Sequence, residues 1–193
     1  MKDKQRCAWP GADTLYVAYH DTEWGVPLHD DRALFELLSL EGAQAGLSWR
    51  TILDRRAAYR AAYHGFAIDR VAAMTEAELD HVLHHGGVVR HRGKVASVRD
   101  NARAAQALIA AEGSLDSWLW SFVGGVPIVT RHRDPAAVPA RTVLSDRLSR
   151  ELRGRGFRFV GPTICYAFMQ AAGLVDDHLA GCFRACAAPP GHP

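Results

Sequence analysis

Hydrophobic positions along the chain repeat with a helical period in most segments, and strand-like alternation is nearly absent. Within residues 31–41, Leu34, Leu37, Leu38 and Glu41 stand at positions i, i+3, i+4 and i+7. These positions share one face of a helix, so the acid lies on the apolar stripe of its own helix. The pattern predicts a helix over this segment and a buried position for Glu41.

Other helices are indicated by the same period and by signals at their ends. A helix is expected after Ser48, with Trp49 on its inner face, and Thr75 opens a capping box in the letters "TEAE". Gly113 should stop one helix and Ser114 should cap the next. The remaining segments are helices at 93–112, 115–123, 145–153 and 162–173, and a long proline-containing loop at 126–143. We therefore expect an all-α fold, formed by a single compact helical domain over residues 1–193.

The composition supports a globular enzyme or binding protein rather than a disordered or membrane-spanning one. Of the 193 residues, 48% are hydrophobic and 23% are charged, which are ordinary proportions for a folded soluble domain. No run approaches the roughly 18 apolar residues of a membrane span, and the opening residues lack the apolar centre of a signal peptide. We expect a cytoplasmic protein with no membrane association. The four cysteines are too few for a disulfide scaffold in a chain this long, which favours free thiols or metal ligands.

The net charge of +2 is too small to indicate nucleic-acid binding by itself, but basic residues crowd around one glycine-rich turn. In "HHGGVVRHRGK", residues 84–94, two glycines end one helix and Gly93 opens the next. The segment from about 76 to 111 resembles a helix-hairpin-helix, whose backbone N–H groups could bind DNA phosphate with charge added by Arg92 and Lys94. An ordinary helical hairpin gives the same sequence pattern.

Two pairs of metal-ligand residues stand near opposite ends of the chain. Cys7 and His20 form one pair, and His178 and Cys182, one helical turn apart, form the other. Two thiolates and two imidazoles favour one tetrahedral Zn²⁺ ion with a structural role. Such an ion would join the terminal segments 1–25 and 174–193. Chance pairs remain an alternative among ten histidines and four cysteines, and Cys186 is a competing ligand.

Aromatic residues gather near the start of the chain and beside the predicted buried acid. They are Trp9, Tyr16, Tyr19 and Trp24, followed by Trp49. Scattered aromatic residues are usually part of a core. The polar company of "YVAYHDTEWG", residues 16–25, instead indicates that they form a pocket with Glu41 for a flat, electron-poor ring.

The motifs together resemble those of the 3-methyladenine DNA glycosylase I family, a branch of the helix-hairpin-helix DNA glycosylases. The resemblance covers nearly the whole chain, and its joint presence in order is more specific than any single piece. It rests on "AYHDTEWGVP" at 18–27, "LEGAQAGLSW" at 40–49, "RHRGK" at 90–94, "WSFVGGVP" at 120–127 and "RGFRFVGPTICYAFMQAAGLVDDH" at 155–178.

The resemblance implies an enzyme that hydrolyses the N-glycosidic bond of 3-methyladenine in alkylated DNA and leaves an abasic site. It implies double-stranded DNA containing alkylated adenine as the partner and free 3-methyladenine as the product. We expect a monomer, although nothing in the sequence shows the oligomeric state. The family's structural zinc would map onto Cys7, His20, His178 and Cys182. Its base pocket would map onto the catalytic Glu41 and onto Tyr19, Tyr16, Trp9 and Trp49.

Several roles stay open from the sequence. Glu41 is expected mainly to recognise the base, although it could also activate the attacking water. Gly46 and Leu47 are expected at the DNA interface, together with Arg92, Gly93 and Lys94 of the hairpin. Asp100 is the nearest acid after the hairpin and receives no role.

Two other functional classes are consistent with the same residues. A zinc-containing helical module could bind DNA or free alkylated base without cleaving it. A zinc hydrolase would need an open position on the metal. The sequence does not decide whether 3-methylguanine is also accepted.

Overall fold

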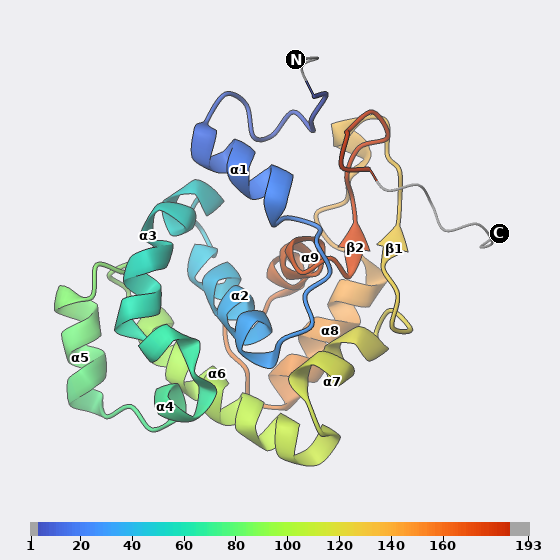
Figure 1. Ribbon diagram of the computed structural model, residues 1–193. Coiled ribbons are helices and arrows are strands. Elements are labelled where there is room, and N and C mark those ends of the chain that lie inside the picture. The colour runs from blue at the N-terminus through green and yellow to red at the C-terminus, as the bar shows by residue number, and fades with distance from the viewer. Residues whose placement is uncertain (1–3, 186–193) are drawn as a thin grey trace.

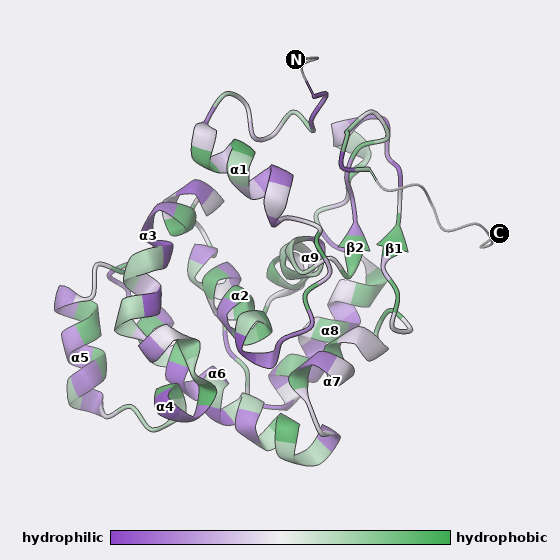
Figure 2. Cartoon of the chain, viewed as in Figure 1, coloured by the Kyte–Doolittle hydropathy of each residue, from purple (hydrophilic) through white to green (hydrophobic). Residues whose placement is uncertain are grey.

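Helices α2 (Asp31–Gln44) and α9 (Pro162–Ala171) pack against each other at the centre of the fold (Figure 1). The computed structural model describes residues 4–185. Phe35 of α2 and Phe168 and Met169 of α9 are fully buried. Most of α9 is hydrophobic, whereas the outer helices alternate hydrophobic and hydrophilic faces (Figure 2). The apolar segment at 162–173 therefore forms the core position that its sequence predicts.

The other elements surround this central pair, and the chain is mostly helical, as predicted. They are α1 (Thr14–Thr22), α3 (Trp49–Ala62), η1 (His64–Phe66), α4 (Ile68–Ala72), α5 (Glu76–His85), α6 (Arg92–Glu112), α7 (Leu115–Ser121), β1 (Ile128–Val129), η2 (Pro135–Ala137), α8 (Val143–Gly154) and β2 (Val175–Asp176).

The helix ends follow from their capping residues. The Asp30 carboxylate accepts a hydrogen bond from the Ala33 amide at the start of α2, and Ser48 caps α3 in the same way. Thr75 and Glu78 form the reciprocal capping box of α5. These short-range signals confirm the predicted starts of the helices.

Several short elements of the structure were not predicted from the sequence. Helix α1 was not expected because its apolar positions do not form one clear face, yet Asp13 caps it at both the Leu15 and Tyr16 amides. The five-residue helix α4 is too short to show a period. The loop at 126–143 contains β1, which pairs in parallel with β2 and aligns Ile128 with Val175. Two-residue strands carry no alternation that a sequence could show.

The two terminal segments lie side by side on one edge of the molecule (Figure 1). The Phe183 amide donates a hydrogen bond of 2.8 Å to the Gln5 carbonyl oxygen. This contact agrees with the prediction that the terminal segments meet. Cys186 and the tail that follows it lie outside the described residues 4–185. Among the described residues, none of the helices combines the length and the apolar character that a bilayer crossing requires.

Candidate active site and metal-binding cluster

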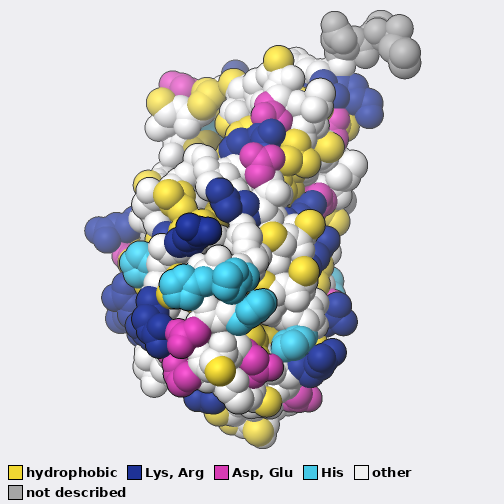
Figure 3. All heavy atoms as spheres, turned by 90° about the vertical axis from the view of Figure 1, so that its left-hand side faces the viewer, with side chains coloured by type: hydrophobic (Ala, Val, Ile, Leu, Met, Phe, Trp, Pro, Cys, Tyr) yellow, Lys and Arg dark blue, Asp and Glu magenta, His cyan; other side chains and the backbone are white. Residues whose placement is uncertain are grey.

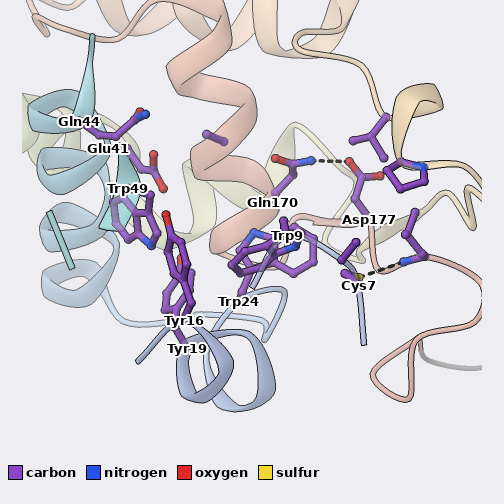
Figure 4. Close-up of a pocket in the computed structure, with 15 residues that line it drawn as sticks. Cys7, Trp9, Tyr16, Tyr19, Trp24, Glu41, Gln44, Trp49, Gln170 and Asp177 are labelled. Atoms are coloured by element: carbon purple, nitrogen blue, oxygen red, sulfur yellow. Dashed lines mark hydrogen bonds between the residues drawn. The ribbon is translucent and has the colours of Figure 1, made fainter. Parts of the chain in front are cut away.

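A cavity of about 450 Å³ opens between α1, α2, α3 and α9. Glu41, Gln44 and Trp49 line one side, and Gln170 and Asp177 line the other (Figure 4). The structure thus brings together all five residues predicted for the base pocket. The full lining also comprises Cys7, Ala8, Trp9, Tyr16, Tyr19, Trp24, Pro135, Val138, Ala167 and Leu179.

Glu41 is an acid that the fold buries in the lining of this cavity without a hydrogen-bond partner among the described residues. Its side chain projects from the inner face of α2 and is 4% exposed, as its position in the helical period predicts. Its carboxyl group has no hydrogen-bond partner among residues 4–185. Desolvation by burial raises the pKa of Glu41 to about 8. A buried acid without a protein partner is suited to a cationic or hydrogen-bond-donating ligand.

Aromatic rings form the walls beside Glu41. The spacing of Tyr16 and Tyr19 places both on one side of α1. Tyr19 lies 5.5 Å from Trp49 between ring centroids, and Trp9 lies 5.5 Å from Tyr16 in an edge-to-face arrangement. The Trp49 indole N–H is buried and has no acceptor among the described residues. These rings can contact a flat ligand on its faces and edges.

The loop between α2 and α3 carries Leu47 between two cavity-lining residues of the sequence, Gln44 and Trp49. The Gln44 side-chain amide donates to the Leu47 carbonyl oxygen at 2.8 Å, and the Leu47 amide donates back to the Gln44 carbonyl oxygen at 2.7 Å. Gly46 has a φ of +75°, a conformation that favours glycine. Leu47 is 40% exposed despite being apolar. The loop therefore exposes an apolar side chain to solvent, and two hydrogen bonds to Gln44 restrain its backbone.

Lys94, which the sequence predicts at a DNA phosphate, is mostly buried against the end of α2. It is 9% exposed, and its ammonium group donates to the carbonyl oxygens of Ala43 and Ala45 at 2.9 and 2.6 Å. These carbonyls end α2, where a helix presents unpaired acceptors and partial negative charge. Burial lowers the pKa of Lys94. The ammonium group of Lys94 thus binds the C-terminal carbonyl groups of α2, the helix that carries Glu41.

The turn between α5 and α6 carries exposed basic residues. Arg90 and Arg92 are exposed, although Arg92 forms an ion pair with Asp80. A Cβ atom on Gly93 would come within 3.1 Å of the His91 ring, which explains the glycine. Figure 3 shows histidine side chains gathered among Lys and Arg side chains on this side of the molecule. The turn combines exposed positive charge with the free amides of a helix start.

Cys7, His20, His178 and Cys182 form a buried cluster whose ligand atoms all lie within 4.8 Å of one another. The Cys182 sulfur lies 3.4 Å from His20 Nε2 and 3.6 Å from His178 Nδ1, and the Cys7 sulfur lies 3.8 Å from His178 Nδ1. Tetrahedral zinc with ordinary bond lengths separates sulfur from nitrogen by about 3.5 Å. The donor set and its spacing therefore fit a metal ion.

The surroundings of the cluster orient both imidazoles toward the sulfurs. His178 Nε2 donates to the Trp24 carbonyl oxygen at 3.2 Å, which leaves the Nδ1 lone pair facing the cluster. His20 Nδ1 lies 2.8 Å from the Asp21 carboxylate, so Nε2 faces inward. Burial lowers the pKa of His178 to about 4, which keeps the ring neutral. Such partners behind metal-ligating histidines are typical of metal sites.

Trp9 connects the cluster to the cavity. Its ring centroid lies 5.4 Å from that of His20 and 5.3 Å from that of Trp24. Cys7 itself lines the cavity. The residues that could hold a metal therefore also support one wall of the candidate active site.

Sequence reasoning assigned no role to several lining residues. Gln44 stands three positions after Glu41 and so on a neighbouring part of the same helix, a spacing that could have identified it. Gln170 and Asp177 reach the cavity from α9 and from the segment after β2. Pro135 reaches it from the long loop at 126–143. Gln170 and Asp177 stand within the motif at 155–178 that carries the family resemblance, which could have drawn attention to them, whereas no local pattern marks Pro135.

Comparisons with known proteins agree with this architecture. The methyladenine glycosylase family matches residues 9–185. DNA-3-methyladenine glycosylase 1 of Escherichia coli strain K12 is 48% identical over 178 residues, which cover 92% of this chain and 95% of the relative. DNA-3-methyladenine glycosylase of Haemophilus influenzae is 46% identical over 177 residues, with 92% and 96% covered.

Solved structures give the same result. A crystal structure of 3-methyladenine DNA glycosylase I superposes with a TM-score of 0.92 at 50% identity, covering 94% of this chain and all of the other. The Staphylococcus aureus enzyme, whose structure addresses recognition of 3-methyladenine, also has a TM-score of 0.92, at 36% identity and coverages of 95% and 98%. With a family match over most of its length and relatives near half identity, the chain belongs to the methyladenine glycosylase family.

Proposed function

We propose that this protein is a DNA base-excision repair glycosylase that hydrolyses the N-glycosidic bond of 3-methyladenine in alkylated DNA. The products are the free base and an abasic site. The observation that carries the proposal is the buried, unpartnered carboxyl group of Glu41 among the rings of an accessible cavity. Homologues across nearly the whole chain have the same activity in their names.

The reaction requires the damaged nucleotide to leave the duplex. Flipping costs a few kcal/mol of unstacking, and the damaged base reduces this cost. Adenine methylated at a ring nitrogen is cationic within the nucleotide, so it is already a good leaving group. The protein therefore needs to bind the base and admit water more than it needs to donate a proton.

Glu41 and Trp49 supply selectivity for the cation. A desolvated cation gains on the order of 1 to 2 kcal/mol against an aromatic face, and a carboxylate adds charge attraction and a hydrogen bond. Entry of a cationic base favours the ionised form of Glu41 and offsets the desolvation that raises its pKa to about 8. A neutral adenine gains less from both residues. We assign base recognition as the main role of Glu41, with activation of the attacking water as its second possible role.

The DNA backbone would lie along the α5–α6 turn and the loop after α2. We propose that the segment at 76–111 acts as a helix-hairpin-helix, with Arg92 and the Gly93 amide at a phosphate. Leu47, which follows Gly46 in the exposed loop, would fill the space that the flipped nucleotide leaves in the duplex. Lys94 supports this loop from beneath through its bonds to the end of α2. Double-stranded DNA containing alkylated adenine is thus the proposed partner of a monomeric, single-domain protein.

We propose one structural zinc ion in the cluster. Cys7, His20, His178 and Cys182 would hold it, and four protein ligands leave no open position for a reacting water. The ion would stabilise the junction of the terminal segments and the Trp9 wall. This closed ligand set disfavours a zinc hydrolase.

Incubation of the zinc-loaded protein with methylated duplex DNA tests the proposed function. Release of free 3-methyladenine, identified by mass spectrometry, with formation of abasic sites is the expected result. A protein that binds methylated DNA or free base but releases nothing would instead be a binding module.

A further inference from the structure

Gln170 faces Glu41 across the cavity. Gln170 belongs to α9 and Glu41 to α2, and Figure 4 shows Gln170 between the Glu41 side of the cavity and Asp177. Gln170 is half-buried, whereas Asp177 behind it is 2% exposed. A pair of polar side chains, Gln170 and the buried Asp177, therefore lies on the side of the cavity opposite Glu41.

Asp177 determines how the Gln170 amide points. One carboxylate oxygen of Asp177 accepts from the Thr130 hydroxyl at 2.6 Å, and the other accepts from the Tyr166 hydroxyl at 2.6 Å. The second oxygen also accepts from Gln170 Nε2 at 2.7 Å. Burial and Asp177 raise the pKa of the Tyr166 hydroxyl, so it stays protonated and donates. Because the amide nitrogen of Gln170 is the donor to Asp177, the amide oxygen of Gln170 does not face that carboxyl group.

The fixed nitrogen leaves the amide oxygen of Gln170 on the other side. In Figure 4 this oxygen points away from Asp177 and toward the Glu41 side of the cavity. It can accept a hydrogen bond and cannot donate one. Because its orientation is set before a ligand enters, it does not have to reorganise on binding.

A hydrogen-bond acceptor at the position of the Gln170 amide oxygen can distinguish two methylated purines that carry the same positive charge. Bases of adenine and guanine methylated at N3 both carry positive charge in the nucleotide, so Glu41 and the aromatic rings attract both. They differ at ring position 6, where adenine has an amino donor and guanine has a carbonyl acceptor. Two acceptors placed against each other leave buried lone pairs without donors, which costs affinity.

We propose that Gln170 is a specificity-determining residue whose amide oxygen accepts a hydrogen bond from the exocyclic amino group of the methylated adenine. Asp177 is a positioning residue that acts through Gln170. The inference rests on the proposed glycosylase function and adds to it a reason to favour 3-methyladenine over purines with a carbonyl at position 6.

Competition between two bases in the same DNA tests the inference. Duplex DNA treated with a methylating agent contains both 3-methyladenine and 3-methylguanine, and the release of each is measured by mass spectrometry. Gln170→Met, similar in size but without an acceptor of this strength, should slow release of 3-methyladenine about tenfold. Release of 3-methylguanine should be unchanged or faster, so the ratio of the two rates falls. If the parent releases too little 3-methylguanine to measure, the affinities of the two free bases, followed by tryptophan fluorescence, supply the ratio.

Two further variants separate specificity from structure. Asp177→Asn can present a donor to Gln170 and should move the ratio in the same direction, provided that zinc content matches the parent. Thr130→Val removes a hydrogen bond from the same carboxylate without touching Gln170, and it should leave the ratio unchanged.

The outcomes are distinguishable. An unchanged ratio in Gln170→Met, with both bases slowed equally, would mean that Gln170 only supports the fold and would overturn the inference. An unchanged ratio in Asp177→Asn would overturn the positioning role of Asp177. A parent protein that releases no methylated base at all would instead refute the proposed function.

Discussion

The ammonium group of Lys94 donates a hydrogen bond of 2.6 Å to the carbonyl oxygen of Ala45, the C-terminal capping residue of α2. Ala45 directly precedes Gly46 and Leu47, and Glu41 lies one helical turn earlier. A residue at the start of α6 therefore holds in place both the helix that carries the acid and the loop that carries the proposed wedge. The Lys94 side chain therefore links the basic turn to the end of the helix that lines the cavity.

Lys94→Met should lower the free energy of unfolding by about 2 to 3 kcal/mol, because buried carbonyls at the end of α2 lose a charged donor. Release of 3-methyladenine should slow because Glu41 and Leu47 lose their support. The dependence of DNA affinity on salt should stay the same, since the charge does not face a phosphate. Arg92→Met, at the exposed position that we propose to contact a phosphate, should reduce that salt dependence by about one phosphate contact. A reduced salt dependence in Lys94→Met would show that Lys94 contacts DNA.

The raised pKa of Glu41 predicts a pH-dependent stability. Between the usual carboxyl pKa near 4.5 and about 8, the folded protein keeps a proton that the unfolded chain has lost. Stability should therefore fall as pH rises through this range and level off above about 8. Glu41→Gln removes this dependence and should be more stable than the parent at pH 9, while it processes the methylated base more slowly. Urea unfolding at several pH values measures the slope, and equal slopes in both proteins would place the Glu41 pKa near its ordinary value.

The position of Glu41 was predictable because a helical period determines which side chains of one helix share a face. The four-residue metal cluster was predictable in part, because cysteine and histidine are common zinc ligands and one such pair stands near each end of the chain. Tyr16 and Tyr19 were assigned to the pocket from the polar composition of residues 16–25 and from the family resemblance, although the helix that carries them was not expected.

Lys94 and Gln170 show what the sequence could not provide. Lys94 stands among basic residues, and its direction depends on where α2 ends, about 50 residues earlier in the chain. The orientation of Gln170 depends on Asp177, a buried carboxylate seven residues later in the chain. Such roles arise from packing between elements distant in sequence, which neither periodicity nor local motifs encode.

Cys182→Ser should lower zinc content and thermal stability together. The serine oxygen is a poor replacement for a thiolate that lies 3.4 to 3.6 Å from both imidazoles. Loss of a structural metal should lower Tm by about 10 °C or more. Cys186→Ser, in the segment outside the described residues, is the matched control and should retain the metal. Metal analysis decides between them, and full zinc in Cys182→Ser with loss in Cys186→Ser would reassign the fourth ligand.

Leu47→Ala should separate contact with the duplex from contact with the base. Leu47 is exposed on a loop tied to Gln44, and its side chain does not line the cavity. If it fills the gap left by a flipped nucleotide, its truncation should slow release of 3-methyladenine from duplex DNA about tenfold, because the unstacking cost is a few kcal/mol. The affinity for free 3-methyladenine, measured by tryptophan fluorescence, should match the parent. The effect should also be smaller on single-stranded methylated DNA, where little stacking has to be broken. An equal loss of affinity for the free base would place Leu47 in the base pocket instead of at the DNA interface.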